Sequence, residues 1–109
     1  MLSEKMQQAL NDQINAETFS AYLYKAMQAY FDSISLKGFA QWMSVQVQEE
    51  TFHADKFFNF IQERNGRVKL MKIEEPQFEW DSPLAAFEAA LKHEQYITSR
   101  INNLVAVAR

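Results

Sequence analysis

Glycine and proline are scarce in this chain, and their scarcity constrains the fold more than any other feature of the sequence. The 109 residues contain two glycines and two prolines. Both residue types interrupt helices, so long stretches without them favour long, unbroken helices. Hydrophobic residues make up 48% of the chain, which is enough for one compact domain. We therefore predict a single all-α domain over residues 1–109.

Three segments carry the apolar periodicity of amphipathic helices. Apolar side chains recur at spacings typical of one helix face over residues 3–31, 36–64 and 82–109. Ser3 and Ser82 are placed to cap the first and third segments, and Asn65-Gly66 is placed to end the second. The apolar positions are Leu10, Ile14, Ala21, Tyr24 and Phe31, then Phe39, Met43, Val47, Phe57 and Phe60, then Leu84, Phe87, Leu91, Ile97, Ile101 and Leu104.

A segment without helical periodicity, residues 66–81, separates the second and third predicted helices. In extended form about sixteen residues reach roughly 53 Å, whereas a helix of about 28 residues is roughly 42 Å long. The segment can therefore travel the whole length of a helical bundle, as the long crossovers of some four-helix bundles do. We predict an up-down-down-up four-helix bundle with three helices present. The third helix runs to Arg109 without a capping signal, so we expect a C-terminally truncated chain that lacks the fourth.

The composition argues against several classes of function. A net charge of −3 and a pI near 5.3 give no reason to expect nucleic acid as a partner. Without cysteine, a metal site would have to use oxygen and nitrogen ligands. No stretch approaches the roughly 18 apolar residues of a membrane span, and the polar N-terminus lacks the apolar core of a signal peptide. We expect a cytoplasmic protein that does not bind membranes.

One glutamate interrupts the apolar stripe of each predicted helix near its middle. Glu17, Glu50 and Glu94 lie at helical spacing between apolar residues, and His53 follows Glu50 at i+3. Burying an ionised carboxylate without a partner is costly, and converging carboxylates repel each other unless a cation lies among them. Inward carboxylates from several helices, with Glu-x-x-His on one, are typical of di-iron bundle proteins. We therefore predict that these four residues bind a hard or borderline dication.

Each of these residues also has a simpler interpretation. A lone glutamate at the edge of a stripe is usually a surface residue, and Glu-x-x-His often arises by chance. Tyr24, two turns from Glu17 on the same face, is either a core tyrosine or a redox-active phenol that orders the site. Glu49 points about 100° away from Glu50 and is either solvated or part of a secondary metal site. His93 is predicted to lie at the surface.

The motifs around these residues resemble those of the bacterial and archaeal non-haem ferritins. Residues 31–39 and 75–83 resemble the archaeal branch most closely, and the resemblance extends in register over essentially the whole chain. The motifs are Asn15-Ala-Glu17, Ala21-Tyr-Leu-Tyr24, Gln48-Glu-Glu50-Thr-Phe-His53-Ala and Lys92-His-Glu94-Gln.

This resemblance implies an iron-storage protein with a ferroxidase centre, which oxidises Fe(II) with O₂ or peroxide. Glu17, Glu50 and His53 would hold one iron. Glu50 would also bridge to a second iron, which Glu94 holds as well. Full-length members of the family form hollow homo-oligomeric cages, usually of 24 subunits, and a fourth helix completes their second iron site.

The resemblance extends to residues near the centre. Tyr24 matches the tyrosine beside the ferroxidase centre, and Glu49 matches a carboxylate of an accessory third iron site. No haem is expected, because the haem-binding branch uses a methionine where Phe52 stands here. Two alternatives differ in function: a truncated or engineered helical module that binds metal without turnover, and a rubrerythrin-like peroxidase. The absence of cysteine argues against the second alternative.

Overall fold

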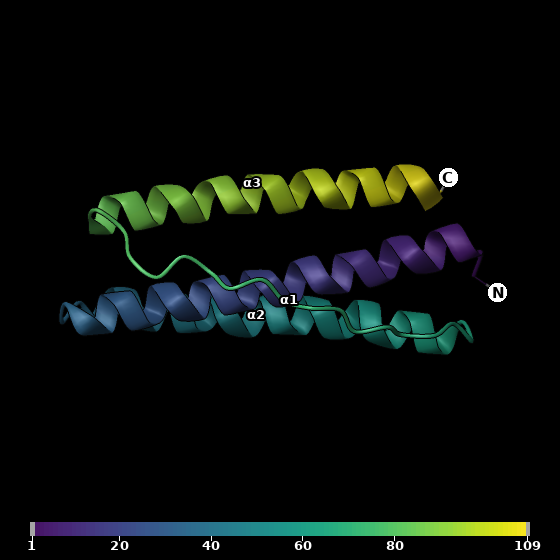
Figure 1. Cartoon of the computed structure of the whole chain (residues 1–109), viewed down its shortest axis with the longest axis horizontal. Coiled ribbons are helices and arrows are strands. Elements are labelled where there is room, and N and C mark those ends of the chain that lie inside the picture. Colours follow the sequence, from purple (N-terminus) through teal and green to yellow (C-terminus); the bar gives the residue numbers. More distant parts are fainter. Residues whose placement is uncertain (1, 109) are drawn as a thin grey trace.

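The computed structural model of the chain describes residues 2–108. Over these residues the chain forms three helices and no strand: α1 (Glu4–Ser33), α2 (Lys37–Glu63) and α3 (Pro83–Ala108). The predicted all-α class is therefore confirmed, while the predicted helix end at Arg109 lies outside the described residues. The bundle measures 49 × 21 × 21 Å. Figure 1 shows α1 antiparallel to both α2 and α3, with the crossover returning the chain along the bundle.

Two serines cap the helices that follow extended chain. The Ser3 hydroxyl accepts a hydrogen bond of 3.1 Å from the backbone amide of Met6. The Ser82 hydroxyl accepts one of 3.0 Å from the amide of Ala85. Each bond satisfies a backbone donor that a helix leaves unpaired at its start. Both caps were predicted from the sequence, and both are confirmed.

The first two helices end through the same backbone motif. A residue in the left-handed region follows each helix, Ser35 after α1 and Asn65 after α2, each with φ of 61°. The next amide then bonds back into the last turn, as that of Gly66 does to the Ile61 carbonyl at 2.8 Å. Gly66 itself has no positive φ. A Cβ there would come within 2.9 Å of Gln7 Oε1 and of Ile61 Cγ2, so a larger residue would require these side chains to shift.

Amide side chains spaced four residues apart on α1 hold the crossover against the bundle. The backbone amide of Arg67 donates to Gln7 Oε1 at 3.0 Å. Asn11 bonds the crossover twice, donating to the Arg67 carbonyl at 3.0 Å and accepting from the Lys69 amide at 2.8 Å. Asn15 donates to a carbonyl further along. The spacing places the three side chains in one row along the helix, so they bind an extended segment.

The hydrophobic core consists of two clusters, one toward each end of the bundle. The first contains Leu23, Tyr24, Met27, Phe31, Ala40, Met43, Trp80, Ala86 and Ala90, and the second contains Leu10, Ile14 and Ile61. Along α1 and α2, the residues between the two clusters include buried polar side chains. These are Glu17, Ser20 and Glu50, and the buried Gln13 adjoins them from within the second cluster. A polar layer therefore crosses the middle of the bundle.

The third helix packs on α1 through small side chains rather than through its leucines. Ala86, Ala90 and Ile97 are buried, whereas Leu84 is 67% exposed and Leu91 60% exposed. The expectation that these two leucines belong to the buried stripe is therefore wrong, because the face of α3 that packs in the bundle runs through Ala86, Ala90 and Ile97 instead. Phe39, expected in the buried stripe of the second helix, is likewise exposed. Within the described residues, no helix combines the length and apolar content of a membrane span.

Candidate metal centre

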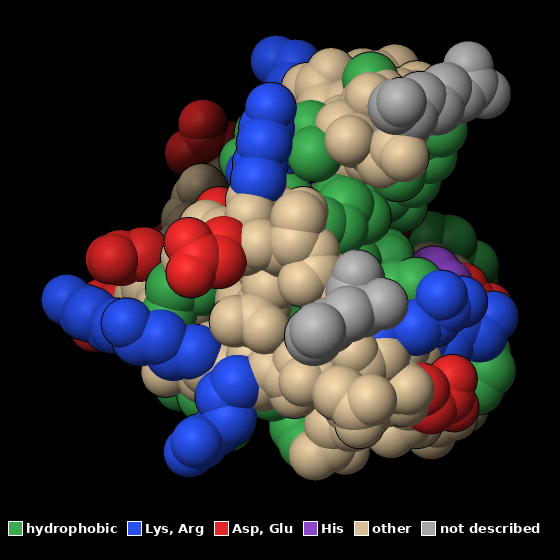
Figure 2. All heavy atoms as spheres, turned by 90° about the vertical axis from the view of Figure 1, so that its right-hand side faces the viewer, with side chains coloured by type: hydrophobic (Ala, Val, Ile, Leu, Met, Phe, Trp, Pro, Cys, Tyr) green, Lys and Arg blue, Asp and Glu red, His purple; other side chains and the backbone are tan. Residues whose placement is uncertain are grey.

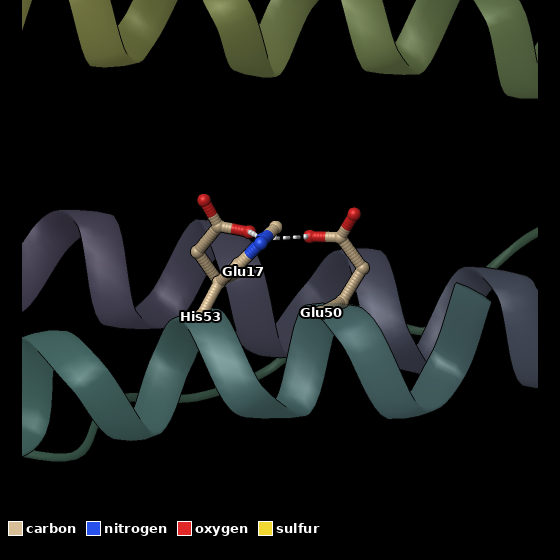
Figure 3. Close-up of side chains that lie close together, drawn as sticks. All are labelled: Glu17, Glu50 and His53. Atoms are coloured by element: carbon tan, nitrogen blue, oxygen red, sulfur yellow. Dashed lines mark ion pairs between the residues drawn. The ribbon is translucent and has the colours of Figure 1, made fainter. Parts of the chain in front are cut away.

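Three predicted ligands come together in the polar layer between α1 and α2. Glu17 from α1 and Glu50 from α2 are 0% and 3% exposed, while His53 is partly exposed. The Nδ1 atom of His53 lies 3.5 Å from Glu50 Oε2 and 3.8 Å from Glu17 Oε2. Figure 3 shows the three side chains converging from the two helices. One ligand atom from each residue lies within 4.8 Å of the other two, so one ion can contact all three.

The two carboxylates are buried close to each other, an arrangement that a bound cation would stabilise. The Oε2 atoms of Glu17 and Glu50 are buried and accept no hydrogen bond. Burial, together with the nearby carboxylates of Glu17 and Glu94, raises the pKa of Glu50 to about 10. Without a cation the layer therefore retains a proton that its carboxylates would otherwise lose. Two carboxylates and an imidazole form a donor set suited to Fe(II), Mn(II) or Zn(II).

The fourth predicted ligand, Glu94, lies beside this group without joining it. Its Oε1 atom accepts a hydrogen bond of 2.6 Å from the Tyr24 hydroxyl. Its carboxylate is close enough to Glu50 to contribute to the raised pKa of that group. Burial, and next the bond to Glu94, raises the pKa of Tyr24 well above its usual range. The phenol therefore stays protonated at neutral pH and orients the Glu94 carboxylate.

The remaining predicted residues differ in their position relative to this site. Glu49 and Phe52 are exposed on α2, facing away from the buried carboxylates. His93 is half-buried, with its Nε2 atom 2.7 Å from the Ser20 hydroxyl, so the prediction that it lies at the surface is wrong. Ser20 already donates to a backbone carbonyl, and its oxygen therefore accepts from Nε2. Burial lowers the pKa of His93, which favours the neutral ring.

An open groove leads from the surface to the ligands. A hollow of about 420 Å³ between α3 and the α1–α2 pair is bordered by Glu17 and His53. The other lining residues are mostly apolar and include Met6, Leu10, Phe57, Phe60, Ile101 and Leu104. Figure 2 shows hydrophobic side chains gathered in this hollow, viewed from the end that carries both termini. A second hollow of about 260 Å³ borders Tyr24 and Glu94, so both parts of the site face the same side of the bundle.

Sequence analysis missed one residue that contacts the site directly. Gln13 is 1% exposed, and its Nε2 atom donates to Glu17 Oε1 at 3.1 Å. The sequence held a signal for it, because Gln13 precedes Glu17 by four residues and so lies on the same helix face. A glutamine between Leu10 and Ile14 is as unusual for a buried stripe as the glutamate that follows.

Comparison with known proteins identifies relatives of the chain. Residues 7–109 match the ferritin-like domain. The chain is 40% identical over 109 residues to a bacterial non-heme ferritin of Staphylococcus aureus, covering all of this chain and 66% of that protein. It is 41% identical over 108 residues to one of Bacteroides fragilis, covering 99% of this chain and 68% of that protein.

Solved structures of ferritins are also similar to this chain. An open pore ferritin from the archaeon Archaeoglobus fulgidus superposes with a TM-score of 0.97 at 62% identity, covering 99% of this chain and 67% of that one. A closed form engineered from the same ferritin superposes equally well, at 62% identity and a TM-score of 0.97. The superposition covers 99% of this chain and 66% of the engineered one. The chain thus spans about two thirds of the length of the proteins it matches. It belongs to the ferritin-like domain family and has the helical-bundle fold of that family.

Proposed function

We propose that this chain is the Fe(II)-binding part of an iron-storage protein with ferroxidase activity. The observation that carries the proposal is the buried pair of unpartnered carboxylate oxygens, Glu17 Oε2 and Glu50 Oε2, facing His53. Glu17, Glu50 and His53 bind one Fe(II). Glu50 also faces Glu94, so these two carboxylates hold a second Fe(II) on the other side of Glu50.

The protein residues give this site its chemistry by binding and orienting two ions close together. Two Fe(II) ions release one electron each, and O₂ accepts both, with two protons, to form hydrogen peroxide. Supplying the electrons as a pair avoids free superoxide. Tyr24 donates to Glu94 at 2.6 Å and so holds the carboxylate of the weaker ion site. Peroxide replaces O₂ as the oxidant where it is available.

The proposal extends to the setting of the intact protein. Its partners are Fe(II), O₂ or peroxide, and further copies of itself in a cage, with neither nucleic acid nor membrane involved. It works in the cytoplasm and carries no haem, as Phe52 offers no ligand atom. The accessory position, Glu49, is exposed, which suits a carboxylate of a third iron site outside the buried layer.

Anaerobic Fe(II) titration followed by exposure to O₂ tests the proposal. We expect saturable binding and then growth of the near-ultraviolet absorbance of ferric iron. Glu50→Ala should lose both signals, since this carboxylate serves both ions. Glu63→Ala, which changes an exposed glutamate of the same helix, should keep them. Unchanged oxidation in Glu50→Ala would refute the ferroxidase assignment.

One observation favours a second candidate, a metal-binding module without turnover. The compact group contains only Glu17, Glu50 and His53, and Glu94 stands outside it. A single ion held in this way would bind without a neighbour to share the two-electron step. In the same titration, this candidate predicts one Fe(II) per chain and no oxidation faster than in buffer.

A further inference from the structure

Gln13 is a buried polar residue whose side chain reaches the candidate site. It lies on α1 one turn before Glu17, and only 1% of it is exposed. A buried amide is tolerated when it is hydrogen-bonded and costs stability when it is not. Its Nε2 atom donates to Glu17 Oε1 at 3.1 Å, a bond within the buried layer. The amide is therefore directed at a carboxylate rather than at backbone or solvent.

The two oxygens of Glu17 consequently have different surroundings. Oε1 accepts the bond from Gln13, whereas Oε2 is buried without a partner and lies 3.8 Å from Nδ1 of His53. Figure 3 shows one oxygen of Glu17 turned toward His53 and the other turned away. A carboxylate held at one oxygen cannot rotate freely about its last bond. Its free oxygen therefore remains aimed at the position between Glu50 and His53.

We propose that Gln13 is a positioning residue that makes Glu17 a one-oxygen ligand, through Oε2, for a divalent cation. This inference rests on the proposed metal-binding function of Glu17, Glu50 and His53. Partners that hydrogen-bond metal ligands fix their orientation, and losing such a partner typically costs about tenfold to a hundredfold in metal affinity. An amide suits this task because its N–H donor adds no charge to a layer crowded with carboxylates.

Co(II) titration of the metal-free protein tests the role of Gln13, because the d–d absorption of Co(II) reports its ligand geometry. Gln13→Met keeps the length of the side chain and removes the donor. We expect a tenfold to hundredfold weaker Co(II) affinity and an altered d–d spectrum, because Glu17 can then rotate and offer both oxygens. If Gln13→Met does not fold by circular dichroism, Gln13→Asn keeps the amide but is too short to reach Glu17, and the same result is expected.

Asn11→Leu is the matched control. It also removes a buried amide from α1, but Asn11 bonds the crossover rather than a carboxylate. It should lower the melting temperature and leave Co(II) affinity and spectrum unchanged. A purely structural role for Gln13 predicts instead that both variants lower stability and that neither alters the spectrum.

A double-mutant cycle separates the failure of this inference from the failure of the metal site. If Gln13 acts through Glu17, Gln13→Met should cause no further loss of affinity in a Glu17→Ala background. The full loss persisting in that background, or wild-type affinity and spectrum in Gln13→Met alone, would overturn the inference. If Glu17→Ala itself binds Co(II) like the wild type, the proposed metal site is wrong.

Discussion

The surroundings of Glu50 disfavour the ionised form of its carboxylate. Glu50 is 3% exposed, and burial, together with the nearby carboxylates of Glu17 and Glu94, raises its pKa to about 10. In an unfolded chain a glutamate has a pKa of about 4.3. Between these two values the folded protein holds a proton that the unfolded chain has released. Protonated Glu50 makes its full contribution to the stability of the folded protein below about pH 4. This contribution is lost as the pH rises toward 10.

Glu50→Gln should therefore flatten the pH dependence of the metal-free protein. The amide cannot ionise, so the variant avoids the loss of stability that the wild type undergoes between about pH 5 and pH 9. The measurement is the melting temperature by circular dichroism in the presence of a chelator at several pH values. Glu63→Gln, at an exposed position of α2, should retain the wild-type slope. Equal slopes for Glu50→Gln and the wild type would show that Glu50 titrates normally.

The pairing of Ser20 with His93 makes a second prediction about single residues. Ser20 is fully buried and accepts from His93 Nε2 at 2.7 Å. Ser20→Ala leaves that donor without a partner, which should cost about 1–3 kcal/mol in the free energy of unfolding. Ser33→Ala removes a comparable serine-to-carbonyl bond at an exposed position and should cost less than about 0.5 kcal/mol. Urea denaturation measures both, and similar losses would argue against the buried pair.

Among the structural elements, the crossover depends most on a few side chains. Asn11, which is 5% exposed, makes two hydrogen bonds to the crossover. Asn11→Ala should lower the free energy of unfolding by about 1–3 kcal/mol, at about 0.5–1.5 kcal/mol per bond. It should also speed hydrogen exchange at the Lys69 amide. Gln8→Ala, which loses one exposed bond on the same helix, serves as the control. Unchanged exchange at Lys69 would mean that the crossover is held by other contacts.

The packing of α3 on α1 depends on the size of its alanines. Ala90 is 6% exposed and belongs to the larger hydrophobic cluster. Ala90→Leu would force the helices apart and should cost about 1–3 kcal/mol, measured by urea denaturation. Ala106→Leu, at an exposed position of the same helix, should have little effect. If Ala90→Leu is as stable as the wild type, Ala90 does not lie in a tightly packed part of the cluster.

At the scale of the whole molecule, the exposed apolar surface favours association. Leu84, Leu91 and Val105 of α3 are all more than 40% exposed, and Val105 borders the largely apolar groove. Contiguous exposed patches of this kind mark interaction sites in soluble proteins. Light scattering should therefore detect an oligomer rather than a particle of 12.8 kDa, and a Leu84→Gln and Leu91→Gln double variant should weaken it. A monomer with a cooperative melt would mean that three helices suffice for a closed core.

Much of the fold could be predicted from the sequence because it depends on local chemistry. The scarcity of glycine and proline, the helical spacing of apolar residues and the capping serines specify three long helices within a few residues of their ends. The length of the segment 66–81 was sufficient to predict a crossover. The grouping of the candidate site was predicted in part for the same reason, since Glu17, Glu50 and His53 interrupt apolar stripes and a helix fixes their direction.

Only the tertiary structure decided which faces meet, because that depends on contacts between residues far apart in the sequence. Hydrophobicity favoured Leu84 and Leu91 for the buried face of the third helix, but the buried face carries Ala86, Ala90 and Ile97. The orientation of α3 about its own axis also brings His93 against Ser20. It also leaves Glu94 beside the group of Glu17, Glu50 and His53 rather than within it. The burial of Gln13 was decided in the same way, since its bond to Glu17 lies within one helix but only the packing of the bundle removes the competing water from it.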